Sequence, residues 1–398
     1  MVDPTTDHAA APRESEDRVT IFVDRFLPPS QAFVIQQASA LVRHRPEFLT
    51  FGRTGSRLSG VGDYPVRNLR DSRLGQAAGL LLKAPRLAPA ALWSGVSGTR
   101  LLHAHFGKNG YILGPLARTL NVPLVTTFHG FDATYAGDPA TPGGFNQTRF
   151  FRTGRAAMAS GKGFSIAVSG FIRERLLAMG FDERRIFQHY IGIDTKLFAP
   201  QPQVVRRKAR VVSVARFVEY KGHRYIIDAL AKVAAAGVPV ELVMIGQGPL
   251  RDEIEQLARR RLPDVVLMEN LSQQEIRDVV SSARVYVHGS VTLENGHAEA
   301  MGLANLEALG VGTPVVAFDS GGVGEAMRPG VTGFTVPERD TDAMADAIGR
   351  LLTDDDLWAA SSQAATAFVA ENFDIQVQSR LLEDYYDAVV ARFNAESK

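Results

Sequence analysis

The chain has 398 residues, of which 45% are hydrophobic and 22% are charged, and its formal net charge is +1 at pH 7. This length and apolar content suffice for two domains with separate cores, whereas a net charge so close to zero says little about partners. The lack of cysteine excludes disulfides and cysteine-ligated metal sites and fits a reducing compartment, and no apolar run approaches the roughly 18 residues of a membrane-spanning segment.

The N-terminal half begins with a polar stretch of mixed charge, residues 1–18, which lacks the apolar core of a signal peptide and is predicted to be a disordered leader. Short apolar runs then alternate with segments of helical period, which is typical of parallel α/β architecture. Strands are predicted at 19–23, 101–105, 123–127 and 165–168, and a helix at 31–42. The apolar segment 74–96 is interpreted as a buried helix pair broken near Pro85 and Pro89; contact with a lipid surface is the alternative.

The pattern restarts after residues 198–208, a charged stretch with prolines that is predicted to be a linker. The second set of predicted strands covers 209–214, 241–245, 265–268, 285–287 and 314–318. Two such sets predict two facing Rossmann-like, doubly wound domains, residues 19–198 and 199–374, with ligands bound in a cleft between them beyond the C-terminal strand ends. The remaining segment, 375–398, is predicted to form a helix over 375–393 that returns toward the N-terminal domain.

The two halves differ in charge. Residues 1–190 carry 23 Lys and Arg against 14 Asp and Glu, whereas residues 191–398 carry 21 against 29. A basic N-terminal half fits an anionic acceptor or an anionic membrane surface. An Arg-rich surface without such a role is the alternative.

Two carboxylates, Glu299 and Glu307, lie eight positions apart around a predicted helix start, and a Gly-Thr-Pro stop and an apolar strand follow. Carboxylates accept hydrogen bonds from sugar hydroxyls, and the amides at a helix N-terminus bind diphosphates. The arrangement therefore suits a nucleotide-sugar. An exposed helix with two solvated glutamates is the alternative.

Two further loops fit a phosphate-bearing ligand. Arg216 and Lys221 lie on one loop before a predicted helix, where the guanidinium can grip a diphosphate with two hydrogen bonds and the ammonium adds a compact charge. Gly246 and Gly248 follow a predicted strand and would let the backbone approach a base or ribose closely. Each motif is weak alone, because surface charge and a tight turn explain them too, and the third glycine of the dinucleotide fingerprint is missing.

Taken in order, these motifs resemble the retaining family-four glycosyltransferases, which have the two-domain GT-B fold. The matching segments are 127–132 (TFHGFD), 167–169 (AVS), 192–194 (GID), Arg216 with Lys221 and Gly222, 246–249 (GQGP), Glu299 with Glu307, and 312–316 (GTPVV). The resemblance covers nearly the whole chain, from residue 19 to about residue 375. Within the family, residues 24–37 and the motif HAHF at 103–106 are similar to the colanic-acid and amylovoran branch, which builds bacterial exopolysaccharide.

The resemblance implies roles in binding the donor. Glu299 would accept hydrogen bonds from hydroxyls of the transferred sugar, and Glu307 would hold the ribose hydroxyls. Gly302, Leu303 and Ala304 would offer backbone amides to the phosphate or the sugar.

Catalytic roles follow from the same resemblance. Arg216 and Lys221 match the pair that binds the diphosphate and would stabilise negative charge on the departing β-phosphate. His129 matches a histidine that contacts the donor sugar from the N-terminal domain, although a histidine bonded within its own loop is the alternative.

The acceptor side is less well defined. Ser30 and Gln31 begin a Ser-Gln-Ala-Phe stretch where the exopolysaccharide branch typically has Ser-Glu-Thr-Phe, so that an amide replaces a carboxylate. His105 is a further candidate; it shares a strand face with His103, and a satisfied structural pair is a better interpretation than a metal site because no third ligand is evident. Asp132 is assigned to loop structure before chemistry.

No general base stands out, which fits the front-face displacement usually pictured for retaining members, in which the departing phosphate takes the acceptor proton. The acidic run at 354–356 imitates the Asp-x-Asp metal motif of the other main glycosyltransferase fold, but it precedes a predicted helix and is interpreted as a cap. Neither a metal nor a cofactor is therefore expected.

The sequence thus predicts a cytoplasmic, metal-independent, retaining hexosyltransferase that uses a nucleotide diphosphate sugar, with a UDP-sugar as the first choice. The expected acceptor is a saccharide or a polyprenyl-linked saccharide in cell-surface polysaccharide biosynthesis. A peripheral contact with the inner face of the cell membrane is a further expectation, and nucleic acid is not expected. The alternatives are a GT-B-fold UDP-sugar epimerase, for which Asp132 is the one acid/base candidate found, and a non-catalytic nucleotide-sugar-binding module.

Overall fold

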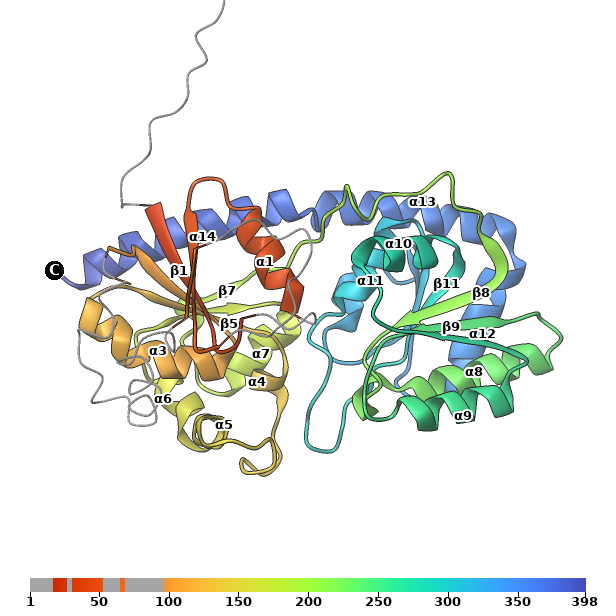
Figure 1. Cartoon of the computed structure of the whole chain (residues 1–398), viewed down its shortest axis with the longest axis horizontal. Coiled ribbons are helices and arrows are strands. Elements are labelled where there is room, and N and C mark those ends of the chain that lie inside the picture. The colour runs from red at the N-terminus through yellow and green to blue at the C-terminus, as the bar shows by residue number, and fades with distance from the viewer. Residues whose placement is uncertain (1–16, 27–30, 53–64, 69–95, 97) are drawn as a thin grey trace, which may run out of the picture. The chain divides into compact units, whose positions relative to one another are not determined.

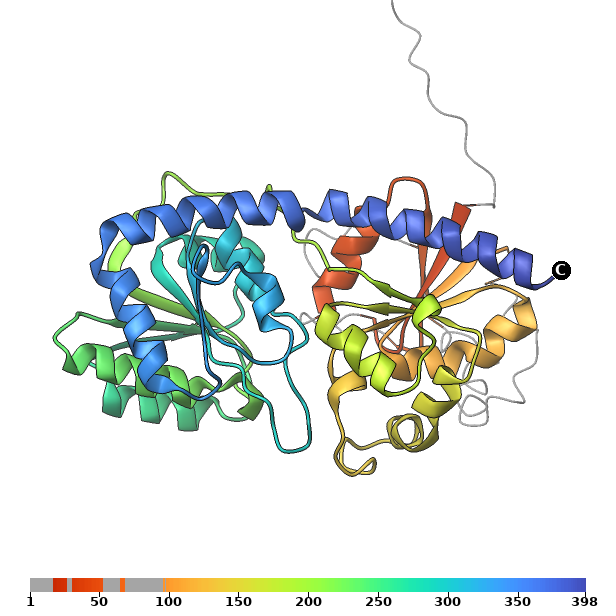
Figure 2. The same cartoon turned by 180° about the vertical axis from the view of Figure 1, so that it is seen from behind.

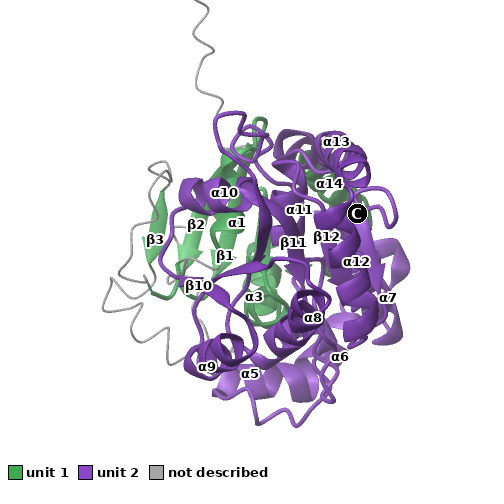
Figure 3. Cartoon of the chain, turned by 90° about the vertical axis from the view of Figure 1, so that its right-hand side faces the viewer, with its two compact units in different colours: residues 1–127, 162–164, 382–398 green, residues 128–161, 165–381 purple. Residues whose placement is uncertain are grey.

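The computed structural model describes residues 17–26, 31–52, 65–68, 96 and 98–398 (Figure 1). Ser30, nearly all of the segment 74–96 and most of the predicted leader lie outside the described residues. Contacts within the chain divide it into two compact units, which Figure 3 shows in different colours. The first unit holds residues 1–127, 162–164 and 382–398, and the second holds residues 128–161 and 165–381.

The first sheet is seven-stranded, in the order β3-β2-β1-β4-β5-β6-β7. Its strands are β1 Arg18–Val23, β2 Arg45–Thr50, β3 Val66–Asn68, β4 Leu101–His105, β5 Leu124–Phe128, β6 Phe164–Ala167 and β7 Ile186–Gln188. β1 pairs in parallel with both β2 and β4, so the strand order reverses there, as in doubly wound folds. β4 is buried along its whole length, as expected for a parallel strand covered on both faces.

All four strands predicted for this half are confirmed. The sequence did not predict β2, which starts with Arg-Pro-Glu before its buried half, nor β3 and β7, which are three residues long. Hydrophobic periodicity cannot be recognised over so few positions.

The helices of this half follow the predicted alternation. They are α1 Ala32–Ser39, α3 Gly107–Leu120, α4 Phe131–Thr134, α5 Phe145–Arg149, a π-helix Phe150–Gly154, α6 Arg155–Ala159, α7 Gly170–Ala178 and a 3-10 turn Glu183–Arg185. α1 ends earlier than the predicted helix at 31–42. The reason lies in Glu383, whose Oε1 accepts hydrogen bonds from the amides of Val42 and His44 at 2.8 and 3.0 Å and so holds this stretch as a loop.

The second sheet is six-stranded, in the order β10-β9-β8-β11-β12-β13. Its strands are β8 Arg207–Val214, β9 Glu241–Ile245, β10 Asp264–Met268, β11 Ala283–His288, β12 Val315–Phe318 and β13 Gly333–Val336. All five predicted strands are confirmed, whereas β13 was not predicted. The predicted linker at 198–208 ends too late, because the amide of Arg207 already donates to the carbonyl of Ser282 and extends the ladder.

Helices cover both faces of this second sheet, as Figures 1 and 2 show from opposite sides. They are α8 His223–Ala235, α9 Arg251–Arg261, α10 Gln273–Ser281, α11 Leu303–Gly310, α12 Thr341–Thr353 and α13 Asp355–Asn372, with 3-10 turns at Glu219–Lys221 and Val323–Ala326. β9 shows the division: Leu242 and Met244 join the core beneath α8, α9 and α12, while Val243 and Ile245 join the core beneath α10, α11 and α13. The predicted Rossmann-like α/β architecture is confirmed.

The last helix, α14 Ile375–Glu396, confirms the helix predicted at the C-terminus. Its residues from Leu382 onward belong to the first unit. There the side chain of Glu383, 1% exposed, accepts the hydrogen bonds from the amides of Val42 and His44, and the Tyr386 hydroxyl lies 2.6 Å from Nδ1 of His103. Within the part of the chain that the structure describes, no helix is both long and apolar enough to cross a membrane.

Candidate active site

Glu299 lies in the loop between β11 and α11, and Glu307 lies inside α11, as the sequence predicted. The carboxylate of Glu299 forms an ion pair with the ammonium group of Lys221, and the two side chains are only 14% and 13% exposed. The Ser290 hydroxyl donates to the same oxygen, Oε2, at 3.3 Å, and Nε2 of His288 lies 3.6 Å from it. Three side chains therefore converge on one carboxylate.

Each group of this ion pair stabilises the charged form of the other. Burial by itself raises the pKa of the Glu299 carboxyl, but the charge of Lys221 and the proximity of His288 lower it more, so the pKa ends well below its usual range. Burial also lowers the pKa of Lys221, and Glu299 more than offsets this, leaving that pKa raised. The pair is consequently a carboxylate and an ammonium ion near neutral pH. Such a carboxylate accepts hydrogen bonds well and protons poorly.

The loop after β8 carries both predicted phosphate-binding cations. Arg216 donates to the Tyr220 hydroxyl at 3.2 Å, and Nζ of Lys221 lies 4.9 Å from the centre of the Tyr220 ring. Gly222 follows with φ +62°, and a Cβ atom there would overlap the carbonyl oxygen of Gly289 at the end of β11. Only glycine fits this close approach. Arg216, Lys221 and Glu299 are thereby brought into one neighbourhood of the second unit.

Gly246 and Gly248 pack closely against the backbone of the loop after β8. A Cβ atom on either would overlap a backbone carbonyl oxygen, that of Ala215 or Phe217 respectively. The amide of Phe217 in turn donates to the carbonyl of Gln247 at 2.8 Å. The close backbone approach that these glycines allow is therefore made to the segment that carries Arg216.

His129 and Asp132 lie directly after β5, in the second unit. Asp132 is 4% exposed, and its Oδ1 accepts hydrogen bonds from the amides of His129 and Gly130 at 3.1 and 3.0 Å. This arrangement supports a loop-forming role for Asp132. A Cβ atom on Gly130 would lie 3.1 Å from Cβ of Ala300, so the His129 loop packs against the residue that follows Glu299.

The Glu299 loop is held from a second side as well. Ser169 donates through Oγ to the carbonyl of Ala300 at 2.7 Å, and the amide of Gly322 donates to the carbonyl of Glu299 at 2.9 Å. Cβ atoms on Gly321 and Gly322 would overlap these same two carbonyl oxygens. Ser169 belongs to the matching segment 167–169, but the sequence did not indicate that it or the Gly321–Gly322 turn holds the backbone of Glu299.

Glu325 has a role that the sequence did not indicate. Its carboxylate accepts hydrogen bonds from the amides of Gly170 and Phe171, at 2.7 and 2.8 Å, and from the Tyr190 hydroxyl at 3.1 Å. Those amides belong to the first turn of α7, where a carboxylate is favoured by the helix dipole. Glu325 thus links α7 to the turn after β12.

The N-terminus of α11 lies between the two predicted carboxylates. Gly302 caps it with φ +87°, and Leu303 and Ala304 form its first turn, where backbone amides have no acceptor inside the helix. Glu307 is half-buried, and burial raises its pKa to about 7. Among the described residues the Glu307 carboxylate has no hydrogen-bond or ion-pair partner, so it can receive hydroxyl donors.

The acceptor-side residues that the structure describes belong to the first unit, apart from Asp132. Gln31 is half-buried at the start of α1, and His105 is buried in β4. Both ring nitrogens of His103 have partners, the Tyr386 hydroxyl at 2.6 Å and the Thr127 hydroxyl at 2.7 Å. The interpretation of His103 as a satisfied structural histidine is confirmed.

The acidic run at 354–356 is a helix cap, as predicted. Oδ1 of Asp354 accepts a hydrogen bond from the amide of Leu357 at 2.9 Å, and Asp355 pairs with Lys208 and Arg284 at 2.6 Å each. These carboxylates are therefore engaged in the structure of α13.

The sequence missed His297, which lies two residues before Glu299. Its Nδ1 is 3.2 Å from the Thr134 hydroxyl, and its ring contacts those of Tyr220 and Phe131, with centroids 4.3 and 5.0 Å away. A single histidine in a loop has no pattern that would mark it, since its partners come from distant segments.

Comparison with known proteins gives two family matches that together span most of the chain. Residues 17–197 match the family described as Glycosyltransferase Family 4, and residues 195–368 match Glycosyl transferases group 1. A protein of Escherichia coli strain K12, named putative colanic acid biosynthesis glycosyltransferase WcaL, is 30% identical over 298 residues, covering 72% of this chain and 70% of the relative. The protein of the same name from Salmonella typhimurium is 27% identical over 412 residues, covering 92% and 98%.

Among solved structures, HepE of Anabaena in complex with UDP-glucose is similar with a TM-score of 0.74 and 19% sequence identity, covering 93% of this chain and 99% of that chain. At this level of identity the likeness concerns the fold. It confirms the GT-B fold predicted from the motifs.

Proposed function

The chain belongs to the group 1 and family 4 glycosyltransferases, and from that premise we propose that it transfers a hexose from a nucleotide diphosphate sugar to a saccharide acceptor with retention of the anomeric configuration. The proposed acceptor is a growing or lipid-linked saccharide of cell-surface polysaccharide biosynthesis. The names of the colanic-acid relatives support this choice, and the basic N-terminal half suits an anionic, lipid-linked acceptor presented on the cytoplasmic side of a membrane.

The observation that carries the proposal is the Glu299–Lys221 ion pair beside Arg216. A carboxylate kept charged by a buried ammonium group is a strong acceptor for hexose hydroxyls. The two cations would stand where negative charge develops on the departing β-phosphate, and preorganised donors of this kind stabilise a transition state more than a ground state.

The nucleotide would be held by the other half of the same neighbourhood. The amides of Leu303 and Ala304 at the N-terminus of α11 suit the diphosphate. Glu307, half-buried and without a partner among the described residues, would accept the ribose hydroxyls. We propose a UDP-sugar as the donor, since HepE, which shares the fold, was solved with UDP-glucose.

The proposed step needs no separate base. The bond from the anomeric carbon to the phosphate oxygen breaks, the bond to the acceptor oxygen forms on the same face, and the acceptor proton passes to the departing phosphate. Glu299 is engaged by Lys221 and Asp132 by the backbone amides after β5, while Glu307 is assigned to the ribose hydroxyls. The same engagement of Asp132 disfavours an epimerase that would need it as an acid/base group.

We further propose that no metal ion is needed, because Lys221 and Arg216 supply positive charge beside Glu299. Purified protein incubated with UDP-, GDP- and ADP-hexoses and acceptor extract tests both proposals. The expected result is transfer from one donor class and full activity in EDTA. The new linkage should have the same anomeric configuration as the donor sugar. Interconversion of the donor sugar without acceptor would show an epimerase instead, and donor binding without turnover would show a binding module.

A further inference from the structure

The loop that carries Glu299 contains a tight turn at residues 293–297. The amide of Gly296 donates to the carbonyl of Leu293 at 2.8 Å, and the amide of Leu293 donates to the carbonyl of His297 at 2.9 Å. We propose that His297, at the end of this turn, is a positioning residue for the transfer reaction. This inference rests on the function proposed above.

The His297 ring lies among side chains from two other segments, α4 and the loop after β8. Its Nδ1 is 3.2 Å from the hydroxyl of Thr134, on α4 just after His129. On the other side its ring meets Tyr220, the residue before Lys221, with centroids 4.3 Å apart. The imidazole thus contacts the segment after His129 and the loop that carries Arg216 and Lys221, and Glu299 follows it in its own loop.

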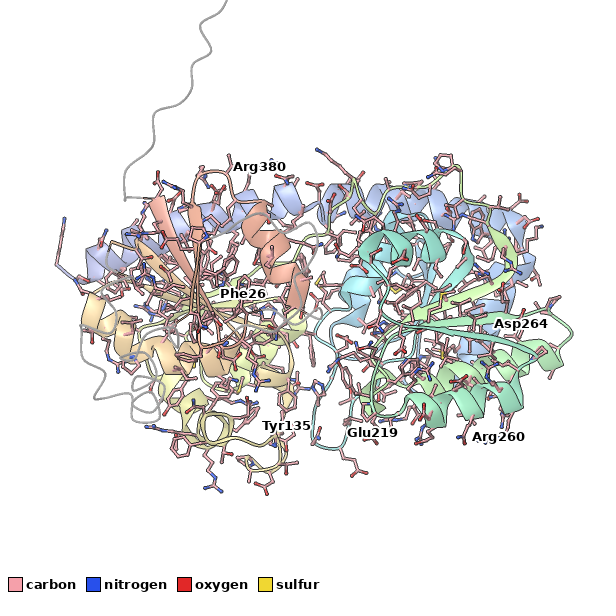
Figure 4. All side chains as sticks on the ribbon, viewed as in Figure 1. Phe26, Tyr135, Glu219, Arg260, Asp264 and Arg380 are labelled. Carbon is pink, nitrogen blue, oxygen red and sulfur yellow. The ribbon has the colours of Figure 1, made fainter. Side chains whose placement is uncertain are left out.

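The backbone of the turn at residues 293–297 also packs closely against α4 and the residues that follow it. The amide of Ala136 donates to the carbonyl of Asn295 at 2.7 Å. Gly296 has φ +77°, and a Cβ atom there would lie 2.8 Å from the carbonyl oxygen of Thr134, closer than real side chains approach. Figure 4 labels Tyr135 and Glu219, which mark the two segments on either side of this turn. The turn is therefore fixed against α4, and His297 has little freedom to leave Tyr220.

The contact between His297 and Tyr220 extends to the phosphate-binding cations. The Tyr220 hydroxyl accepts a hydrogen bond from Arg216, and the Tyr220 ring lies 4.9 Å from Nζ of Lys221. Tyr220 therefore packs against His297 and also contacts both cations. Displacing catalytic groups by about 1 Å can lower the rate of transfer by about 100-fold, so an unsupported Tyr220 should slow turnover.

The charge state of His297 fits this position. Its pKa is lowered to about 4, mainly by burial; the charge of Glu299 opposes this shift, and the charges of Lys221 and Arg216 contribute to it. The ring is consequently neutral at physiological pH. A neutral imidazole can pack on Tyr220 without repelling the two cations, which a permanently charged side chain at this position could not do.

Three variants of the full chain test the proposal: His297→Ala, His297→Asn and Glu294→Gln. The Asn amide can still bond the Thr134 hydroxyl, and Glu294 is an exposed residue of the same turn that serves as a control. Each is measured for kcat, for KM of the donor, for inhibition by free UDP and for Tm. UDP inhibition matters because the proposed ribose and α11 contacts do not involve His297.

For His297→Ala we expect kcat to fall about 10-fold or more, since the catalytic loops are only misplaced and not removed, while inhibition by UDP weakens less than kcat falls, because Glu307 and the α11 amides still bind the nucleotide. His297→Asn should recover part of kcat, and Glu294→Gln should behave like the wild type. The inference is overturned if His297→Ala turns over normally, if His297→Asn is no better than His297→Ala, or if UDP inhibition weakens as much as kcat falls. A wild-type protein that transfers no sugar would instead contradict the proposed function.

Discussion

Replacing Lys221 by methionine removes one partner of the most enclosed ion pair of the site. The side chain keeps its approximate length, but the Glu299 carboxylate, 14% exposed, loses its ammonium partner. Ser290 still donates to Oε2 at 3.3 Å. The variant therefore leaves a buried charge with one weak hydrogen bond and with Nε2 of His288 at 3.6 Å.

The size of the effect follows from that geometry. Removing one member of a buried ion pair typically lowers the free energy of unfolding by 3–5 kcal/mol. Because both side chains keep some exposure and Ser290 remains, we expect the lower end, about 3 kcal/mol. Turnover should fall about 10²–10³-fold, the usual effect of removing one preorganised donor to a developing negative charge.

The pH dependence of the free energy of unfolding gives a second test of the Glu299–Lys221 pair. In the wild type the pKa of Glu299 is lowered and that of Lys221 is raised, so the pair stabilises the fold between the unfolded-state pKa values of Glu and Lys, roughly pH 4.3 to 10.4. In Lys221→Met the charge of Lys221 is lost, so burial, which raises the pKa of Glu299, is opposed only by His288. The variant should therefore lose less stability at pH 4 than at pH 7, because protonation neutralises the unpaired carboxylate.

Urea denaturation followed by circular dichroism measures stability, and a coupled assay for released nucleotide measures turnover. Lys232→Met on α8 is the matched control, because its pair with Asp342 is exposed and should contribute less than about 1 kcal/mol. The double variant Lys221→Met/Glu299→Gln should be more stable than Lys221→Met alone, since no buried charge is left unpaired. Equal stability of these two variants, or normal turnover by Lys221→Met, would refute the reasoning.

Two further changes probe the nucleotide side and the support of the loop. Glu307→Gln should weaken UDP binding about 10-fold or more, as expected for loss of a charge-assisted hydrogen bond, in isothermal titration calorimetry. Because the pKa of Glu307 is raised to about 7, wild-type UDP affinity should fall as the pH drops through 7, whereas a similar fall in Glu307→Gln would argue against the assignment. Ser169→Ala removes the hydrogen bond to the Ala300 carbonyl and should lower stability by about 1 kcal/mol and kcat more than UDP affinity; unchanged kinetics would show that the loop is held without it.

The sequence predicted the second sheet well because β8, β9, β11 and β12 are apolar runs bounded by loops, whereas β2 and β3 are too polar or too short for such a pattern. Motif order placed Glu299 and Lys221 in one site, but not as partners of each other. Their pairing depends on how Gly222 fits against Gly289, which is tertiary information. Ser169 and Glu325 show the same limit, because their bonds to Ala300 and to the amides of α7 join residues more than a hundred positions apart in the sequence.

The bonds that Ser169 and Glu325 make have a consequence for protein engineering. If the N-terminal half binds the acceptor, as we propose, exchanging the N-terminal halves of related transferases at the predicted linker near residue 198 is a route to new acceptor specificity. Such a chimera would separate Ser169 from Ala300, and the amides of α7 from Glu325, into parts of different parentage. Grafts that keep both ends of these bonds from one parent should retain turnover, whereas grafts that mismatch them should fold and bind nucleotide yet transfer sugar slowly.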